Sequence, residues 1–255
     1  MIFWWCDQEL NGGAAARAFS TMEEVFALDG ERITQDPLSW VVRVEREGKR
    51  YYVKRYVGNG KNALRRWFGL RQWLAPTRVK KEWQNLLRFQ EWGIPTARLA
   101  AYGIENRYGG FRRGALITEE IRDTADLATL ALQQDIRLRN SHWVGLVSAQ
   151  IARITRRMHE AGFVHNDLKW RNVLVTHGDA PTVYLIDCPS GGNWWGPFLQ
   201  YRIVKDLACL DKVAKYRLTR SQRLRFYLDY VQRRHLTETD KKRVRKIIRF
   251  FEGRE

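Results

Sequence analysis

The chain has 255 residues, of which 44% are apolar, with 11 Trp and no low-complexity tract. This composition can bury one large core or two modest lobes, and it excludes an intrinsically disordered protein. No run approaches the roughly 20 consecutive apolar residues of a membrane-spanning helix. The opening MIFWWC is too short for a signal-peptide core and has no basic region before it. We therefore expect a protein that is made and kept inside the cell.

The formal charge is +17, from 45 Lys and Arg against 28 Asp and Glu. Such an excess indicates a polyanionic partner, which could be nucleic acid, an anionic membrane face or a phosphorylated substrate, although a solvated basic surface without a partner is the alternative. The cysteines are Cys6, Cys188 and Cys209, an odd number without a C-x-x-C pair. This pattern argues against a disulfide framework and a structural zinc site.

The first half of the chain predicts strands and one helix. Residues 39–56 predict a β-hairpin, and residues 97–104 and 114–121 predict two further strands. Residues 75–93 predict a helix that ends at Gly93 and has one apolar face, formed by Val79, Trp83, Leu86 and Leu87.

One carboxylate lies on that apolar helix face. Glu82 follows Val79 by three residues, and an unpaired carboxylate in such a position would be costly to bury. It needs a buried cation, and Lys54 on the neighbouring strand is a candidate. The alternative is that Glu82 lies at the edge of the apolar face and reaches water.

The second half predicts helices around one further hairpin. Residues 141–162 predict a long helix, and residues 173–175 and 182–187 predict a hairpin. The last third reads as helices, the final one with a capping box of Thr237 and Asp240. We therefore expect two lobes, 1–120 rich in strands and 121–255 rich in helices, with a cleft between them for a small molecule.

The stretch VHNDLKWRNVLV, residues 164–175, gathers polar groups between apolar runs. The following hairpin should bring Asn172 close to Asp187, because its strands pair antiparallel. Two hard oxygen ligands at this spacing predict a magnesium site with room for phosphate oxygens. Asp167 would lie near the metal and face an acceptor hydroxyl, which is the arrangement that phosphoryl transfer requires.

These residues resemble the motifs of protein kinases. HNDLKWRN resembles the catalytic loop H-R-D-x-x-x-x-N, and IDCPSGG lies where kinases carry D-F-G. YYVKRY resembles the strand with the nucleotide lysine, and KKEW the helix with its glutamate partner. The resemblance implies that Asp167 is the base that orients the hydroxyl and that Lys169 neutralises charge on the transferred phosphoryl group. It implies that Asn172 and Asp187 bind magnesium. Lys54 would bind the ATP phosphates, and Glu82 would position Lys54.

The same resemblance implies supporting positions. LITEEI resembles the strand that enters the kinase hinge, so the backbone around Glu119 and Glu120 would meet the adenine. VKDLACL resembles the helix whose Asp braces the catalytic loop, which makes Asp206 structural, and His165 would also support the loop. A G-x-G-x-x-G loop and an A-P-E signature are missing from the sequence. These differences argue against a regulated protein kinase and favour the smaller enzymes that phosphorylate small molecules or glycans.

The stretch from residue 52 to 103 is similar to one family in particular, the bacterial lipopolysaccharide kinases. It has a lysine strand, a basic and aromatic insertion, a helix with E-W, and G-I-P-T followed by Ala97 where the family has Pro. The resemblance covers about residues 50–210 and implies an α+β, two-lobed, protein-kinase-like fold. It further implies an enzyme that uses ATP and Mg²⁺ to phosphorylate a sugar of the lipopolysaccharide inner core, with heptose favoured over Kdo.

The basic insertion suits a membrane-bound acceptor. Residues 58–81 hold seven Lys or Arg and no Asp or Glu. We expect Lys61, Arg65, Arg66 and Arg71 to contact the core glycolipid and the anionic inner-membrane surface, which makes the enzyme peripheral to that membrane on its cytoplasmic side. An RNA backbone with stacked bases would suit the same pattern, although nucleic acid is not the expected partner. A solvated basic loop is the remaining reading.

Two other functions remain open. The first is a kinase that acts on an RNA-associated protein or on a small molecule such as an aminoglycoside, although a charge of +17 repels cationic acceptors. The second is a basic, kinase-like binding module without catalysis. The presence of Lys54, Asp167, Asn172 and Asp187 together argues against a module without catalysis.

Overall fold

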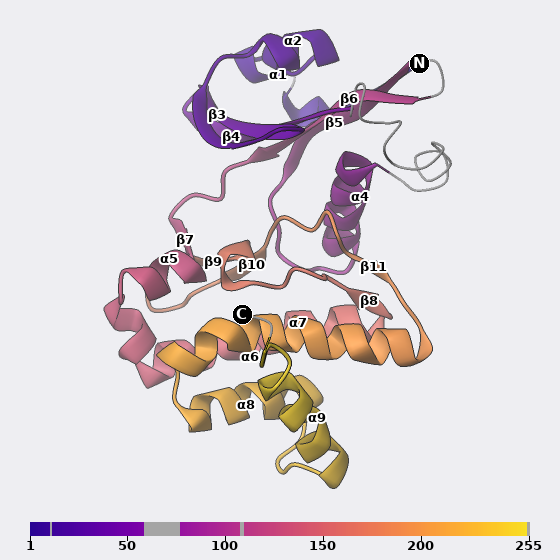
Figure 1. Ribbon diagram of the computed structural model, residues 1–255. Coiled ribbons are helices and arrows are strands. Elements are labelled where there is room, and N and C mark those ends of the chain that lie inside the picture. The colour runs from indigo at the N-terminus through magenta and orange to yellow at the C-terminus, as the bar shows by residue number, and fades with distance from the viewer. Residues whose placement is uncertain (11, 59–76, 108–109, 254–255) are drawn as a thin grey trace. The chain divides into compact units, whose positions relative to one another are not determined.

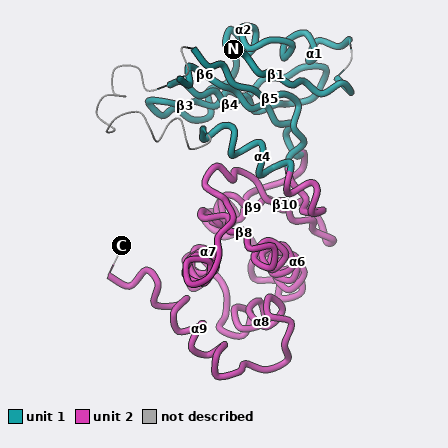
Figure 2. Tube along the Cα trace, turned by 90° about the vertical axis from the view of Figure 1, so that its right-hand side faces the viewer, with its two compact units in different colours: residues 1–87, 97–121 teal, residues 88–96, 122–255 magenta. Residues whose placement is uncertain are grey.

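The computed structural model describes residues 1–255 except 11, 59–76, 108–109 and 254–255. The chain forms two compact units, one of residues 1–87 with 97–121 and one of residues 88–96 with 122–255 (Figure 2). The first is built on a sheet and the second mainly of helices, which gives the α+β class expected from the sequence.

The first unit contains a six-stranded antiparallel sheet in the order β1-β5-β6-β4-β3-β2. Its strands are β1 (Ile2–Cys6), β2 (Glu31–Asp36), β3 (Ser39–Arg46), β4 (Lys49–Val57), β5 (Leu99–Arg107) and β6 (Gly110–Glu119). The predicted hairpin of residues 39–56 is confirmed as β3 and β4. Strand β2 was not predicted, because all six of its side chains are exposed and its sequence lacks an apolar alternation.

The two faces of this sheet carry different side chains, because neighbouring residues of a strand point to opposite faces. Tyr51 and Val53 of β4 are fully buried with Phe19, Met22 and Val25, which belong to the segment of helices α1 (Ala14–Ala18) and α2 (Met22–Ala27). Figure 1 shows these helices on one side of the sheet and α4 (Arg78–Glu91) on the other. The face toward α4 is the one that carries Lys54.

Helix α4 forms as the sequence predicted. Val79, Trp83 and Leu86 are buried, and Trp83 stacks on Tyr102 of β5 with ring centroids 4.9 Å apart. The helix ends at Glu91, and Gly93 closes the turn after it with a φ of 61°, a conformation that glycine adopts without steric cost.

Among its described residues, the second unit packs five helices with two small sheets. The helices are α5 (Leu127–Leu132), α6 (Ser141–Glu160), α7 (Gly196–Arg217), α8 (Arg220–Val231) and α9 (Glu238–Ile248), with 3-10 turns η3 (Ile136–Arg139) and η4 (Trp170–Asn172). The strands are β7 (Thr124–Asp126), β8 (Phe163–Val164), β9 (Val173–Thr176), β10 (Val183–Leu185) and β11 (Gly192–Asn193). The predicted long helix, the predicted hairpin and the capping box of Thr237 with Asp240 are all present.

Residues 88–96 lie with the second unit, whereas the sequence analysis placed them in a lobe of residues 1–120. Pro95 accepts the Leu185 N–H at 2.9 Å, and the Thr96 hydroxyl donates to the Leu185 carbonyl at 2.6 Å. Phe89 packs edge-on against Phe163 with centroids 5.8 Å apart. The segment therefore extends the edge of β10, and such a pairing between distant residues leaves no local pattern in the sequence.

Candidate active site

A buried ion pair connects β4 to α4 in the first unit. Lys54 Nζ lies 2.9 Å from Glu82 Oε1, and Glu82 is only 3% exposed. A carboxylate at this depth without a cation would be strongly unfavourable, so the pair holds the lysine at one place on the sheet. The structure thus brings together the two residues that the sequence analysis paired.

Tyr56 belongs to the same group, and sequence reasoning missed it. Its hydroxyl donates to Glu82 Oε2, and the Lys54 ammonium lies 5.6 Å from the centre of its ring. Burial, followed by the neighbouring Glu82 carboxylate, raises the pKa of Tyr56, so the phenol remains a neutral donor. The signal was present in the sequence, because Tyr56 follows Lys54 by two residues and must share its face of the strand.

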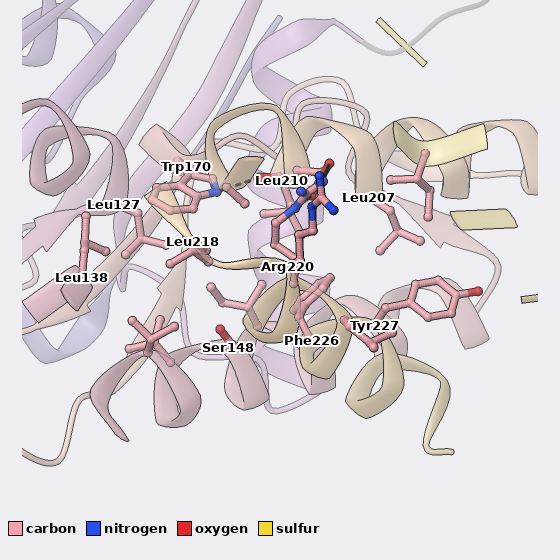
Figure 3. Close-up of a pocket in the computed structure, with 18 of the residues that line it drawn as sticks. Leu127, Leu138, Ser148, Trp170, Leu207, Leu210, Leu218, Arg220, Phe226 and Tyr227 are labelled. Atoms are coloured by element: carbon pink, nitrogen blue, oxygen red, sulfur yellow. Dashed lines mark hydrogen bonds and ion pairs between the residues drawn. The ribbon is translucent and has the colours of Figure 1, made fainter. Parts of the chain in front are cut away.

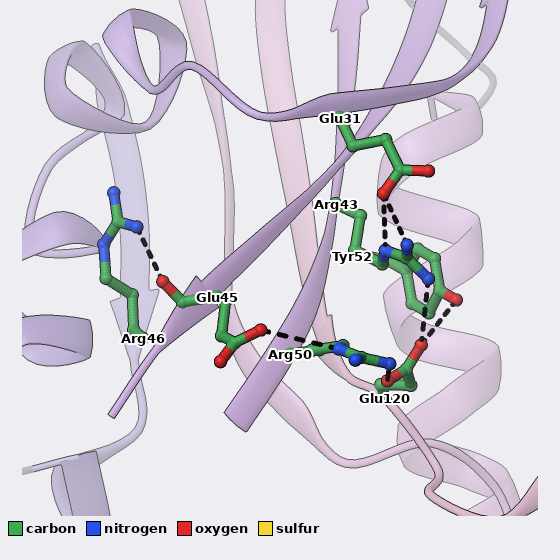
Figure 4. A network of polar contacts seen from close by, with 7 residues as sticks. All are labelled: Glu31, Arg43, Glu45, Arg46, Arg50, Tyr52 and Glu120. Atoms are coloured by element: carbon green, nitrogen blue, oxygen red, sulfur yellow. Dashed lines mark hydrogen bonds and ion pairs between the residues drawn. The ribbon is translucent and has the colours of Figure 1, made fainter. Parts of the chain in front are cut away.

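The end of β6 contains Glu119 and Glu120, the residues expected near adenine. Their N–H groups donate to the carbonyls of Arg98 at 2.9 Å and Arg50 at 2.8 Å. The Glu120 carboxylate accepts a 2.9 Å hydrogen bond from the Tyr52 hydroxyl, and the guanidinium groups of Arg43 and Arg50 lie beside it (Figure 4). A base at this segment would therefore meet carbonyl oxygens and the polar cluster around Tyr52.

The catalytic-loop residues gather around the β9–β10 hairpin of the second unit. The Ile186 N–H donates to the Asn172 carbonyl at 3.0 Å, which places Asn172 beside the residue that precedes Asp187. Asn172 also donates through Nδ2 to the Asp167 carbonyl at 2.8 Å. Asp187 has a φ of 57°, a left-handed conformation that is uncommon for residues other than glycine and often marks functional sites.

Two cations lie against the Asp167 carboxylate. Lys169 Nζ is 2.5 Å from Oδ1, and Arg171 Nη2 is 3.2 Å from Oδ2. Partial burial raises the pKa of Asp167, and the neighbouring Lys169 and Arg171 lower it. Together the two cations outweigh the burial, so the pKa of Asp167 lies below its usual value. Asp167 is therefore a carboxylate at neutral pH, better suited to orienting a hydroxyl than to removing its proton early.

Asp206 of α7 supports the backbone of the predicted catalytic loop. The fully buried Asp206 accepts the His165 N–H through Oδ2 at 2.7 Å, and His159 Nε2 lies 3.4 Å from the same oxygen. The hydroxyl of Tyr230 on α8 lies 2.9 Å from His159 Nδ1. This buried chain joins α6, α7 and α8 to the backbone of the catalytic loop.

The imidazole of His165 is itself fully buried. Burial lowers the pKa of His165, so its ring is neutral, and it stacks on Phe89 with centroids 6.3 Å apart. Within the described residues neither ring nitrogen has a hydrogen-bond partner. Sequence reasoning did not find His159 or Tyr230, because each is an ordinary position on a helix until the helices pack.

Four predicted site residues lie outside the described residues. They are Lys61, Arg65, Arg66 and Arg71 of the basic insertion. The structure gives no placement for them.

The second unit also contains an apolar cavity of about 470 Å³ that the sequence analysis did not predict. Figure 3 shows side chains from α6, α7 and α8 around it, with Trp170 of η4 at one side. Its lining includes Val147, Leu210 and Ile247. The charged groups of the lining are Arg220, Arg223 and Asp211, and Arg223 Nη2 lies 2.6 Å from Asp211 Oδ2. A cavity of this size and character suits a long apolar group.

Comparison with solved structures defines the class of protein. The structure solved as "WaaP in complex with acyl carrier protein" matches with a TM-score of 0.72 and 26% sequence identity, and the match covers 98% of each chain. The chain accordingly has the protein-kinase-like fold expected from the sequence. Its match to a family of kinases makes it a phosphotransferase, and membership of such a family implies the use of ATP.

Sequence comparisons then identify the family. The model of the lipopolysaccharide kinase (Kdo/WaaP) family matches residues 28–246, and the chain belongs to this family. A lipopolysaccharide core heptose(I) kinase WaaP of Pseudomonas aeruginosa is 28% identical over 218 residues, which are 83% of this chain and 80% of the relative. A 3-deoxy-D-manno-octulosonic acid kinase of Actinobacillus succinogenes is 30% identical over 126 residues, about half of each chain, at 49% and 50%.

The buried contact of Asp206 leads to a first prediction. Asp206→Ala should destabilise the protein by about 1–3 kcal/mol, because the His165 N–H is left unpaired inside the protein. It should also lower turnover, whereas Asp206→Asn keeps an acceptor oxygen and should cost less in both respects. Denaturant unfolding and kinase assays measure the two effects. Asp229→Ala, which breaks an exposed ion pair with Arg225, is the control and should have little effect. Equal losses in all three variants would contradict the bracing role.

The lowered pKa of Asp167 leads to a second prediction. Lys169→Gln removes the nearer cation, so the pKa of Asp167 rises and the acid limb of kcat moves to higher pH. Arg171→Gln should move the limb less, because its guanidinium is farther away and more exposed. The pH profile of kcat measures both shifts. An acid limb that stays in place in Lys169→Gln shows that Asp167 does not control turnover.

Proposed function

We propose that this enzyme transfers the γ-phosphoryl group of ATP to a hydroxyl of heptose in the lipopolysaccharide inner core. The observation that carries the proposal is the arrangement of Asp167, Asn172 and Asp187 around the β9–β10 hairpin, in a chain of the lipopolysaccharide kinase family. Heptose is favoured over Kdo because the heptose kinase relative aligns over 83% of this chain and the Kdo kinase over 49%.

Asp167 acts on the acceptor. Its carboxylate accepts a hydrogen bond from the sugar hydroxyl and aims the oxygen at the γ-phosphorus. A new oxygen–phosphorus bond forms, the bond to the bridging oxygen of ADP breaks, and the hydroxyl proton passes to the Asp167 carboxylate and then to solvent. Its lowered pKa suits a late proton transfer, because the loose transition state of phosphoryl transfer requires little activation of the nucleophile. Lys169 offsets negative charge on the transferred group.

The first unit contributes the nucleotide lysine. Lys54 would bind the ATP phosphates, while Glu82 holds its ammonium and Tyr56 holds the second oxygen of Glu82. Adenine would lie along the end of β6 at Glu119 and Glu120, next to Tyr52.

Asn172 and Asp187 would hold Mg²⁺. Both supply hard oxygen atoms, and the backbone bond from Ile186 to Asn172 keeps them adjacent. In the described part of the chain no group of three or more His, Cys, Asp or Glu forms a metal site of its own. Two protein ligands suit Mg²⁺ because phosphate oxygens and water complete its shell. When bound, Mg²⁺ neutralises charge on the phosphates.

The acceptor glycolipid places the enzyme at a membrane. In the described residues no helix is both long and apolar enough to span a bilayer. We propose a peripheral enzyme on the cytoplasmic side of the inner membrane, with the basic insertion of residues 58–81 as one contact to the anionic lipid surface.

A second binding function is favoured by the apolar cavity. The solved structure that resembles this chain is WaaP in complex with acyl carrier protein. We propose that this chain also binds an acyl carrier protein, and that the acyl chain enters the cavity. The lining is apolar at Val147, Leu210 and Ile247, as an acyl chain requires. Arg220 would meet a polar or anionic group of the carrier, whereas Arg223 is already engaged by Asp211.

A third prediction tests phosphoryl transfer. Asp167→Asn should lower kcat by at least about 100-fold, since general-base groups typically contribute this much, and it should leave ATP affinity nearly unchanged. Asp187→Asn should instead weaken ATP binding in the presence of magnesium. Phosphate incorporation into a core oligosaccharide that contains heptose, detected by mass spectrometry, is the measurement. A wild-type enzyme that phosphorylates Kdo and leaves heptose unmodified would overturn the choice of sugar.

A fourth prediction tests the cavity. Val147→Trp should fill it and weaken binding of acylated carrier protein at least tenfold, because the added ring occupies volume that the acyl chain would need. Leu132→Trp adds a similar side chain at a residue that is 82% exposed, and it should bind as the wild type does. Thermal unfolding of both variants verifies the fold. Equal binding by the two variants would show that the acyl chain lies elsewhere.

A further inference from the structure

The last helix carries a face of unpaired positive charge. Residues 241–249 contain six Lys or Arg and no Asp or Glu. Lys242, Arg245 and Lys246 lie on one face of α9, because Arg245 and Lys246 follow Lys242 by three and four residues. Arg249, the C-cap residue, continues this face, and all four side chains are exposed. The opposite face packs into the core through Val244 and Ile247.

Charges of the same sign at this spacing destabilise a helix. Elsewhere α9 compensates its charges: Lys241 pairs with Glu238, and Asp240 accepts from Arg233. Among the described residues no carboxylate pairs with Lys242, Arg245, Lys246 or Arg249. The fold therefore gains no ion pair from these four residues, and an external anion would relieve their repulsion.

Aromatic side chains continue the same surface at the start of α7. Trp195 is 76% exposed, Phe198 67% and Tyr201 53%, which is unusual for rings of this size. The Tyr201 ring contacts Phe250 just after α9, with centroids 5.6 Å apart. Gln200 accepts from Arg243 at 3.3 Å. These contacts join the aromatic edge of α7 to the basic face of α9.

We propose that this basic–aromatic surface, formed by Trp195, Phe198, Tyr201, Lys242, Arg245, Lys246 and Arg249, docks the enzyme on an anionic lipid bilayer. The inference rests on the proposed function in one respect, since a kinase of core glycolipid has a membrane-borne acceptor. It differs from the basic insertion in lying entirely within the described second unit.

The arrangement favours a lipid surface over a nucleic acid. Basic residues near an anionic bilayer are attracted to its headgroups, and Trp and Tyr suit the boundary between headgroups and acyl chains. Here the charges lie on one helix and the rings on the edge of another. A surface for single-stranded nucleic acid would instead alternate rings with charges along one track, so that successive bases stack.

The position in the unit leaves the catalytic loop accessible. Figures 1 and 2 both show α8 and α9 on one side of α6 and α7, with β8, β9 and β10 on the other. Changes on the outer face of α9 should therefore alter lipid binding without altering the chemistry on a soluble acceptor.

The test compares two variants of equal charge change. One changes Lys242, Arg245, Lys246 and Arg249 to Gln. The other changes Arg139, Arg153, Arg157 and Arg217, which are exposed elsewhere on the second unit, to Gln. Each basic residue at an anionic surface strengthens binding by about fivefold at low salt, so the first variant should bind phosphatidylglycerol-containing vesicles at least about tenfold more weakly. The second should bind nearly as the wild type does.

Three further readouts make the outcome decisive. Wild-type binding should weaken as salt rises, and it should fall on vesicles of phosphatidylcholine alone. Phe198→Ala should weaken vesicle binding but keep the dependence on salt, because it removes an apolar contact. All variants should phosphorylate a water-soluble core oligosaccharide at the wild-type rate.

Equal vesicle binding by the two quadruple variants would overturn the proposal. So would an α9 variant that keeps its binding to vesicles but loses binding to an RNA oligonucleotide. Vesicle binding is measured without an acceptor, so it stands apart from the proposed activity. A wild-type enzyme that docks on vesicles but phosphorylates no core sugar would overturn the proposed function and leave the docking surface intact.

Discussion

The hydrogen bond from the His165 N–H to the buried Asp206 carboxylate is the interaction on which the predicted catalytic loop depends. A carboxylate removed from water must find hydrogen-bond donors, and Asp206 finds them in the His165 N–H and in His159. That need fixes the backbone two residues before Asp167, because the loop cannot move away without stranding a buried charge. Helix α7 therefore positions the loop through one residue, and Tyr230 of α8 supports the arrangement through His159.

The first unit uses the same constraint at the lysine that we propose to bind the nucleotide. Glu82 lies on the buried face of α4, and both its oxygens are engaged, one by Lys54 and one by Tyr56. Because the buried Glu82 carboxylate requires a cation, it fixes the position of the Lys54 ammonium on the sheet. In each unit, then, a buried acid positions the neighbouring group proposed to act on substrate, and the more exposed Asp167 pairs with the partly exposed cations Lys169 and Arg171.

The excess of positive charge divides among different tasks. Some cations serve internal carboxylates, as Arg112 and Arg113 do at Glu105 and Arg98 at Asp7. Others lack an acid nearby, and those on α9 form a continuous face beside exposed rings. An anionic glycolipid acceptor and an anionic membrane are both consistent with this surplus. The apolar cavity of the second unit is a separate feature, and we propose it only as the place for an acyl chain.

The sequence by itself determined the class and the family, and it supplied the candidate residues of the site. These predictions came from short-range patterns. They are the motif H-x-D-x-K-x-x-N, the hairpin that carries Asn172 and Asp187, and the apolar helix face on which a buried Glu82 requires a cation. Strands β1 and β2 were not predicted, since β2 is exposed at every residue and β1 pairs with β5 across about a hundred residues. The tertiary structure alone decided the pairing of residues 95–96 with β10, the chain from Tyr230 through His159 to Asp206, and the apolar cavity. Each of these features depends on residues that are far apart in the sequence and meet only when separate elements pack. Contacts of this kind leave no periodic pattern along the chain, so the sequence could not predict them.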